Sequence, residues 1–193
     1  MSDTGLSAPR QPGAGFMATT AGQIVAILLI VLAMVAWLTA LGRPLVCPCG
    51  NIEFWQGDLS PEENSQQFSD WYSGLHVVFG MALFGFITWM KPHWSIGAKL
   101  VIAIASSAMW EAMENTPFLI ALFAVSPDAP DYRGDSILNA AGDTIFVVAG
   151  FLAATSLPVW ASVLLAIAFE VAISLAIDDG FVIGTLRLLG VPL

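Results

Sequence analysis

The feature that most constrains this chain is a series of apolar runs, each about long enough to cross the hydrocarbon core of a bilayer. We expect five such spans, at about residues 23–41, 72–90, 96–115, 135–156 and 158–177. The composition agrees, because 57% of the residues are apolar and only 11% are charged, about half the charged fraction of a typical soluble domain. The sequence therefore predicts an all-α, polytopic membrane bundle of about five transmembrane helices.

The polar segments divide the rest of the chain. Residues 1–22 are small, polar and rich in Pro and Gly, which predicts a disordered cytoplasmic tail. Residues 23–193 are expected to form a single transmembrane domain with a hydrophilic loop at 42–70. The segments 117–125 and 178–193 stay open, because each could span the membrane, re-enter it or lie on its surface.

The few basic residues set the expected orientation. Lys91 and Lys99 flank the short connection between the second and third spans, and Arg10 lies in the tail, so these parts are predicted to be cytoplasmic. Arg43 and Arg133 disagree with that assignment. The resulting topology is N-in and C-out, with the loops 42–70 and 126–134 in the periplasm.

With this topology, many polar residues fall in the outer half of the membrane. The candidate catalytic residues are His76, Glu111, Glu114 and Asp143, and the candidate ligand-binding residues are Asp70, Asn115, Arg133, Asp135 and Asn139. Asp135, Asn139 and Asp143 step by four, so they share one helical face. Ionisable groups at such depth cost several kcal/mol unless they find partners inside the bundle. The sequence therefore predicts an outward-opening polar cavity walled by the second, third and fourth spans, with Glu170 as a further candidate.

Three chemistries fit this group: binding of a divalent metal, acid–base catalysis with His76, or a proton or ion path. Structural roles stand beside them, because Asp135 is a good helix N-cap, Asn139 could join helices, and a lone histidine is often a satisfied core residue. Glu111 and Glu114 are unfavourable together as two ionised groups without a cation. A metal between them is one solution, and a protonated or hydrogen-bonded carboxyl is favoured because only one histidine is near.

The outer loop carries a separate signal, Cys47-Pro-Cys49-Gly. In an oxidising compartment the two cysteines could form a disulfide, or their thiolates could hold a metal. The alternative is a loop stiffened by Pro and Gly in which the thiols have no role.

The net charge of −9, with only six Lys and Arg, excludes nucleic acid as a partner. Membrane lipid is the expected partner, and a membrane-protein partner stays open. The sequence specifies no cofactor, no particular metal and no oligomeric state.

The strings "CPCG", "ENSQQFSDWYSGLHVVFG", "WEAMENTPF", "YRGDSILNAAGDT" and "LPVW" resemble a family of bacterial multi-pass inner-membrane proteins without an assigned activity. More distantly, the order of Asp70, His76, Glu111, Asp135 and Asn139 is similar to that in VanZ-type membrane proteins. The resemblance implies a location in the bacterial inner membrane.

The chain departs from that family pattern at two places. Phe79 stands where the pattern has a second histidine, and Ala121, Leu122 and Phe123 stand where it has basic residues. If those groups perform the family's chemistry, this member is inactive; Arg133 could replace a lost cation.

The leading hypothesis is a membrane protein that binds a lipid head group or another small ligand at the periplasmic leaflet. One alternative is an intramembrane hydrolase or transferase acting on a lipid-linked substrate, and another is a non-catalytic assembly subunit. An enzyme should lose function with Glu111→Gln or Asp143→Asn, whereas an assembly subunit should respond to changes in the 42–70 loop.

Overall fold

The computed structural model describes residues 19–58, 60, 62–124 and 132–191, and within these ranges every regular element is a helix. The helices are α1 (Thr20–Ala40), α2 (Ser73–Met90), α3 (Ile96–Glu114), α4 (Pro117–Phe123), α5 (Ile137–Ser156), α6 (Val159–Ile177) and α7 (Phe181–Leu188). Five of them, α1, α2, α3, α5 and α6, are long and apolar enough to cross a membrane. The predicted all-α architecture with five spans is therefore confirmed.

The segments 117–125 and 178–193, whose relation to the membrane the sequence left undecided, each contain a short helix. Pro117 opens α4, where its missing N–H would have no partner in any case, and the Thr116 hydroxyl accepts a hydrogen bond from the Leu119 amide. Neither α4 nor α7 has the roughly 17 residues needed to cross a bilayer. Residues 1–18 of the predicted tail and 126–131 of the predicted loop lie outside the described residues, and 20–22 belong to α1.

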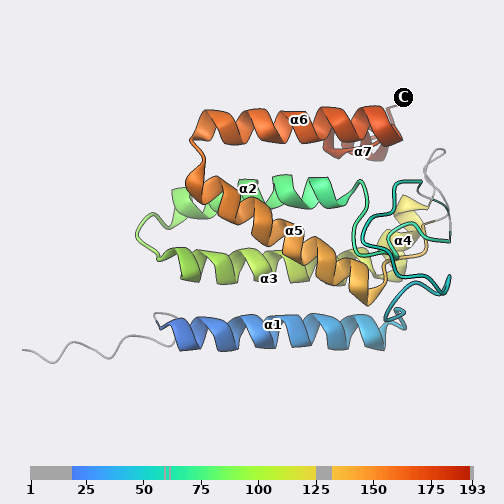
Figure 1. Ribbon diagram of the computed structural model, residues 1–193, viewed down its shortest axis with the longest axis horizontal. Helices are drawn as coiled ribbons and strands as arrows, with labels where there is room; N and C mark the ends of the chain where they lie inside the picture. Colours follow the sequence, from blue (N-terminus) through green and yellow to red (C-terminus); the bar gives the residue numbers. More distant parts are fainter. Residues whose placement is uncertain (1–18, 59, 61, 125–131, 192–193) are drawn as a thin grey trace, which may run out of the picture.

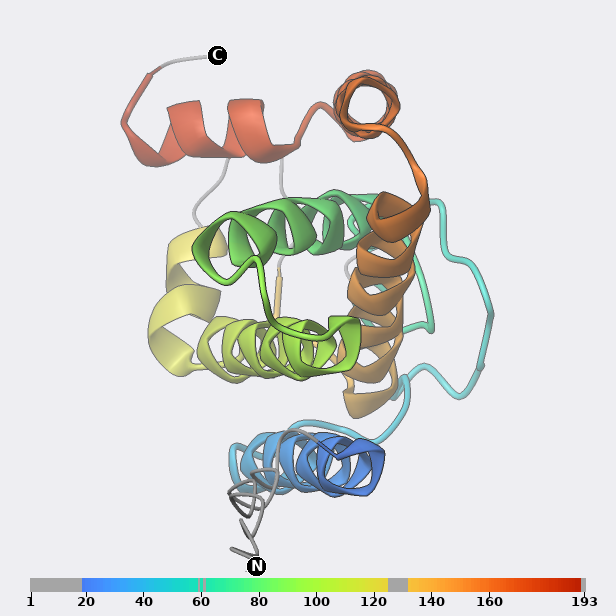
Figure 2. The same cartoon turned by 90° about the vertical axis from the view of Figure 1, so that its left-hand side faces the viewer.

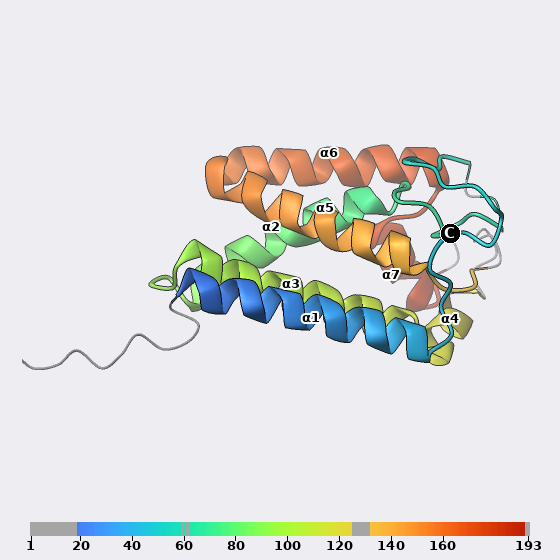
Figure 3. The same cartoon turned by 60° about the horizontal axis from the view of Figure 1, so that its bottom comes forward.

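The long helices run side by side, with α5 inclined across the others (Figure 1). Viewed along the bundle, α2, α3 and α5 surround its centre, while α1 lies against α3 and α6 lies on the α2 side (Figure 2). The 42–70 loop and α4 lie at one end, which we call the loop end, and the α2–α3 connection lies at the other (Figures 1 and 3).

The most extensive helix contact is that between α2 and α5. A Cβ atom on Gly80 would lie 2.0 Å from the Val147 carbonyl oxygen, and one on Gly150 would lie 1.9 Å from the Val77 carbonyl oxygen. Small residues let helix backbones approach this closely, so the two glycines fix how α2 crosses α5. Phe151, which is fully buried, packs beside this crossing.

The helix α1 packs on the opposite side of the bundle. Met34 and Leu38 are buried against Ala108 of α3 and against the start of α5. The Trp37 indole N–H donates a 3.0 Å hydrogen bond to the Ala112 carbonyl. These contacts hold α3 in place behind the polar residues described below.

The 42–70 loop completes the start of α5. The first amides of a helix have no partner within the helix. Here the Ile137 amide donates to the Pro44 carbonyl at 2.8 Å, and the Ser136 amide donates to the Ser65 carbonyl at 3.0 Å. The loop is therefore a packed part of the bundle.

The same loop contains the two cysteines. The sulfurs of Cys47 and Cys49 are bonded to each other, and the Gln67 side-chain amide donates to Cys49 Sγ at 3.5 Å. A disulfide leaves no thiolate, so the structure favours this alternative over a thiolate metal site.

The glycine crossing predicts an asymmetric response to added methyl groups. Gly150→Ala should lower the stability by about 1–3 kcal/mol, because the new Cβ meets backbone that has no room to move. Gly85→Ala, on the exposed face of α2 with open space around it, should be neutral or stabilising. Thermal unfolding in detergent, followed by tryptophan fluorescence, compares the two; equal shifts would contradict the close crossing.

Candidate functional site

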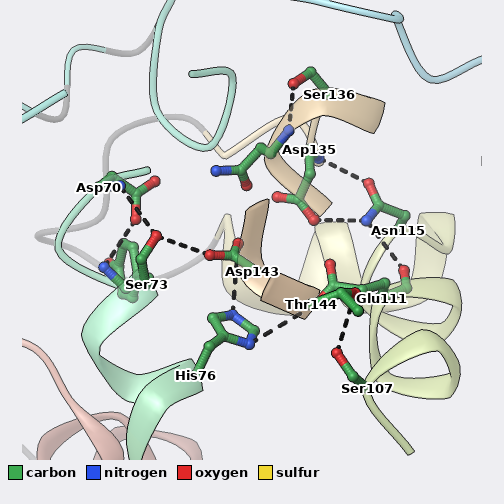
Figure 4. Close-up of polar contacts among 12 residues, drawn as sticks. Asp70, Ser73, His76, Ser107, Glu111, Asn115, Asp135, Ser136, Asp143 and Thr144 are labelled. Atoms are coloured by element: carbon green, nitrogen blue, oxygen red, sulfur yellow. Dashed lines mark hydrogen bonds and ion pairs between the residues drawn. The ribbon is translucent and has the colours of Figure 1, made fainter. Parts of the chain in front are cut away.

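Three polar residues, Asp70, Ser73 and His76, follow one another at a spacing of three around the start of α2. The Tyr72 amide donates to Asp70 Oδ1 at 2.8 Å, and the Asp70 amide donates to Ser73 Oγ at 3.2 Å. The Ser73 hydroxyl in turn donates to Asp143 Oδ1 of α5 at 2.8 Å (Figure 4). Asp70 therefore orders the entry to α2 and holds Ser73 against Asp143.

His76 lies one turn further along, between two carboxylates from two other helices (Figure 4). Its Nε2 is 3.6 Å from Asp143 Oδ2, and its Nδ1 is 3.8 Å from Glu111 Oε1. These separations suit ion pairs and are longer than hydrogen bonds. The spans α2, α3 and α5 thus each contribute one side chain to a single group.

Glu111 has no exposed surface, and neither of its carboxylate oxygens has a hydrogen-bond partner among the described residues. Such a buried, unpaired carboxylate is costly and rare. Glu111 also belongs to a second group, with Glu114 and Asp135, in which one oxygen of each residue lies within 4.8 Å of the others. The structure therefore brings all the candidate catalytic residues together around Glu111.

Asp135 is held by three hydrogen bonds. Its Oδ2 accepts from the Asn115 side-chain amide at 2.6 Å, its Oδ1 accepts from the Tyr132 hydroxyl at 2.9 Å, and its amide donates to Asn115 Oδ1 at 2.7 Å. The alternative that Asp135 is the N-cap of its helix is wrong. That role belongs to Ser136, whose side chain accepts from the Asn139 amide at 3.0 Å. Because its side chain does not cap the helix, Asp135 can line the cavity.

Three other candidates lie away from this group. The Asn139 side-chain amide donates to the Gln67 carbonyl at 2.9 Å, so it holds the loop. The Arg133 side chain is exposed and does not line the cavity, although its carbonyl accepts from Arg43. Glu170 accepts from the Phe181 amide at 3.1 Å and caps α7.

A cavity of about 530 Å³ opens beside the polar group. His76, Glu114, Asp135 and Asp143 line its polar part, and Leu75, Phe79, Trp110, Leu122, Phe123 and Phe181 line its apolar part. Residues from α4 and α7 therefore complete a wall that sequence reasoning assigned only to α2, α3 and α5. Phe79 belongs to the apolar part of this lining.

Ser73, Tyr132 and Arg187 were not among the site residues predicted from the sequence. The spacing of Asp70, Ser73 and His76 could have revealed Ser73, since all three share one helical face. No local signal marks Tyr132 or Arg187. Arg187 reaches the cavity from α7, where it pairs with Asp178 at 3.3 Å.

Burial shifts the acidity of several groups that lie just outside the spans. Burial, followed by the charge of Asp143, raises the pKa of Asp70 to about 8. Burial also raises the pKa of Asp135, although the hydrogen bonds from Tyr132 and Asn115 oppose the rise. Burial and the charge of Asp135 together raise the pKa of the Tyr132 hydroxyl.

The raised pKa of Asp70 predicts a pH-dependent stability. The folded state holds a proton on Asp70 up to about pH 8, whereas the unfolded chain loses it near 3.8, so stability falls as pH rises between these values. Asp70→Asn keeps the acceptor for the Tyr72 amide and removes the titration. The variant should therefore gain in melting temperature relative to wild type between pH 5 and pH 9. A constant difference across this range would show that Asp70 ionises freely in the folded protein.

Comparisons with known proteins identify a family but no biochemical activity. Residues 38–193 match the family described as "Protein of unknown function (DUF2585)". The chain is 41% identical over 167 residues to the UPF0314 protein of Sphingopyxis alaskensis, covering 86% of this chain and 88% of that one. It is 38% identical to the UPF0314 protein of Paracoccus denitrificans, covering 84% and 83%. No solved structure gives a significant match. The chain belongs to the DUF2585 family.

Proposed function

We propose that this chain is an integral protein of the bacterial inner membrane that binds the polar head group of a membrane amphiphile from the periplasmic leaflet. The observation that carries the proposal is the cavity, which joins a polar floor of carboxylates and one imidazole to apolar walls. An amphiphile needs both surfaces, one for its head group and one for its chain. A water-soluble metabolite would gain little from the apolar walls.

The position of the cavity supports a ligand that arrives from the bilayer. Its apolar lining includes Phe123 of α4 and Phe181 of α7, the two short helices at the loop end. Phe181 is 45% exposed, so the rim continues onto the outer surface of the bundle. A volume of about 530 Å³ lies within the range of small-ligand sites, and it suits a head group with the first part of a chain.

The disulfide supports the proposed orientation. Cys47 and Cys49 lie in the 42–70 loop, and disulfides persist in oxidising compartments such as the periplasm. The loop end would then be periplasmic, and the α2–α3 connection with Lys91 would be cytoplasmic. Arg43 donates to the Arg133 carbonyl, so its guanidinium is engaged within the protein.

Acid–base catalysis on a lipid-linked substrate is the second candidate. It is favoured by His76, whose two ring nitrogens each face a carboxylate, at 3.6 and 3.8 Å. Phe79 stands against it, since it offers no second imidazole. The distant resemblance to VanZ-type proteins stays a prediction.

A block in the cavity tests the proposed binding. Wild-type protein, washed extensively with detergent, should retain about one amphiphile per chain, detected by native mass spectrometry and identified after extraction. Leu75→Trp should remove it, because Leu75 lines the cavity and a larger ring fills the space. Leu152→Trp is the matched control, since Leu152 is 47% exposed on α5. Absence of the amphiphile from wild type, or equal retention in both variants, would refute the proposal.

The retained molecule also separates binding from catalysis. If Asp143→Asn retains a chemically different amphiphile from wild type, the protein converts its ligand. If the molecule is the same, the cavity binds it without reaction.

The orientation has its own test. In a background lacking Cys47 and Cys49, Glu53→Cys should react with an impermeant thiol reagent in cells whose outer membrane is permeabilised. His93→Cys should react only after the inner membrane is opened. Both positions are exposed, and they lie at opposite ends of the bundle. The reverse pattern would place the cavity on the cytoplasmic side.

A further inference from the structure

The buried carboxylate of Glu111 is shared between two groups of metal-ligating side chains. The first group is Glu111, His76 and Asp143, and the second is Glu111, Glu114 and Asp135. Within each group, one donor atom from every residue lies within 4.8 Å of the others. Donors on one metal ion, with bonds of about 2.0–2.2 Å, lie at most about 4.4 Å apart, so small side-chain movements would close each group.

Glu111 is the feature that points to a ligand. Both of its carboxylate oxygens are buried and lack hydrogen-bond partners among the described residues, and the side chain belongs to both groups. The sequence favoured a protonated or hydrogen-bonded carboxyl, and for Glu111 the described residues provide no hydrogen bond. A buried carboxylate that belongs to two sets of donors is placed to act as a bridging ligand.

The charge of the carboxylates also favours bound cations. Glu111, Glu114, Asp135 and Asp143 carry four negative charges when ionised, and two divalent cations would neutralise them with His76 left neutral. Arg187 pairs with Asp178 and Asp179, and Arg43, which donates to the Arg133 carbonyl and whose charge also acts on Asp135, offsets at most one of the four negative charges.

We propose that Glu111 bridges a two-cation centre, with His76 and Asp143 completing one position and Glu114 and Asp135 completing the other. The oxygen-rich donor set with a single imidazole suits Mn²⁺, Fe²⁺ or Zn²⁺.

Neighbouring residues orient the ligands, as they do in established metal sites. The Ser73 hydroxyl donates to Asp143, while Asn115 and Tyr132 both donate to Asp135. The binding of cations here requires no amphiphile, although His76, Glu114, Asp135 and Asp143 also line the cavity of the proposed function.

Metal-free, full-length protein in detergent is titrated with Mn²⁺ alone, and bound metal is measured by equilibrium dialysis. We expect two Mn²⁺ per wild-type chain and an exchange-coupled electron paramagnetic resonance spectrum. Glu111→Gln should weaken binding at both positions by about 100-fold or more, since even outer-shell changes weaken metal binding by about 10–100-fold. Asp143→Asn and Asp135→Asn should each leave one Mn²⁺ with an isolated six-line spectrum.

Glu53→Gln is the control, because Glu53 is an exposed carboxylate of the loop and should leave both ions bound. Melting curves of the metal-free variants check that each is folded. Zero or one Mn²⁺ in the wild type, or two in Glu111→Gln, would overturn the proposal. Retention of an amphiphile by metal-free protein is measured separately, so the two proposals can fail independently.

Discussion

The close crossing of α2 and α5 is the contact on which the rest of the structure depends. Gly80 and Gly150 let the two backbones touch, at Val147 and Val77 respectively. This contact sets the register that places Ser73 and His76 of α2 against Asp143 of α5. A bulkier residue at either glycine would separate the helices, and the polar group would lose the partners that make its burial tolerable.

The polar residues near the loop end form two sets: one binds the backbone of the 42–70 loop, and the other lies beside the cavity. Ser136 and Asn139 bind carbonyls of the 42–70 loop, at 2.8 Å to Gln66 and 2.9 Å to Gln67. They hold an irregular segment against the bundle, where its backbone groups need partners. His76, Glu111, Glu114 and Asp143 bind no loop backbone in the described structure and gather beside the cavity. Polar residues at the same end of the bundle therefore serve structure in one set and, as proposed, ligand chemistry in the other.

The short helices decide how the cavity meets its surroundings. Glu170 accepts from the first amides of α7, and the Tyr72 hydroxyl donates to Asp179 at 3.1 Å just before that helix. These bonds hold α7 beside the polar group, where Arg187 reaches the rim. An apolar wall is thereby added to a floor of carboxylates, which is the combination that an amphiphile needs.

The sequence by itself determined the membrane class, the five spans and most of the polar group. Apolar runs show span lengths directly, and carboxylates inside them are expensive enough to signal inward-facing positions. Only the tertiary structure decided the roles of individual residues. It gave the N-cap to Ser136 rather than Asp135, turned Asn139 toward the loop, left Arg133 exposed and brought α7 with Arg187 to the cavity. These outcomes depend on contacts between segments far apart in the chain, and spacing along one helix carries no information about its partners.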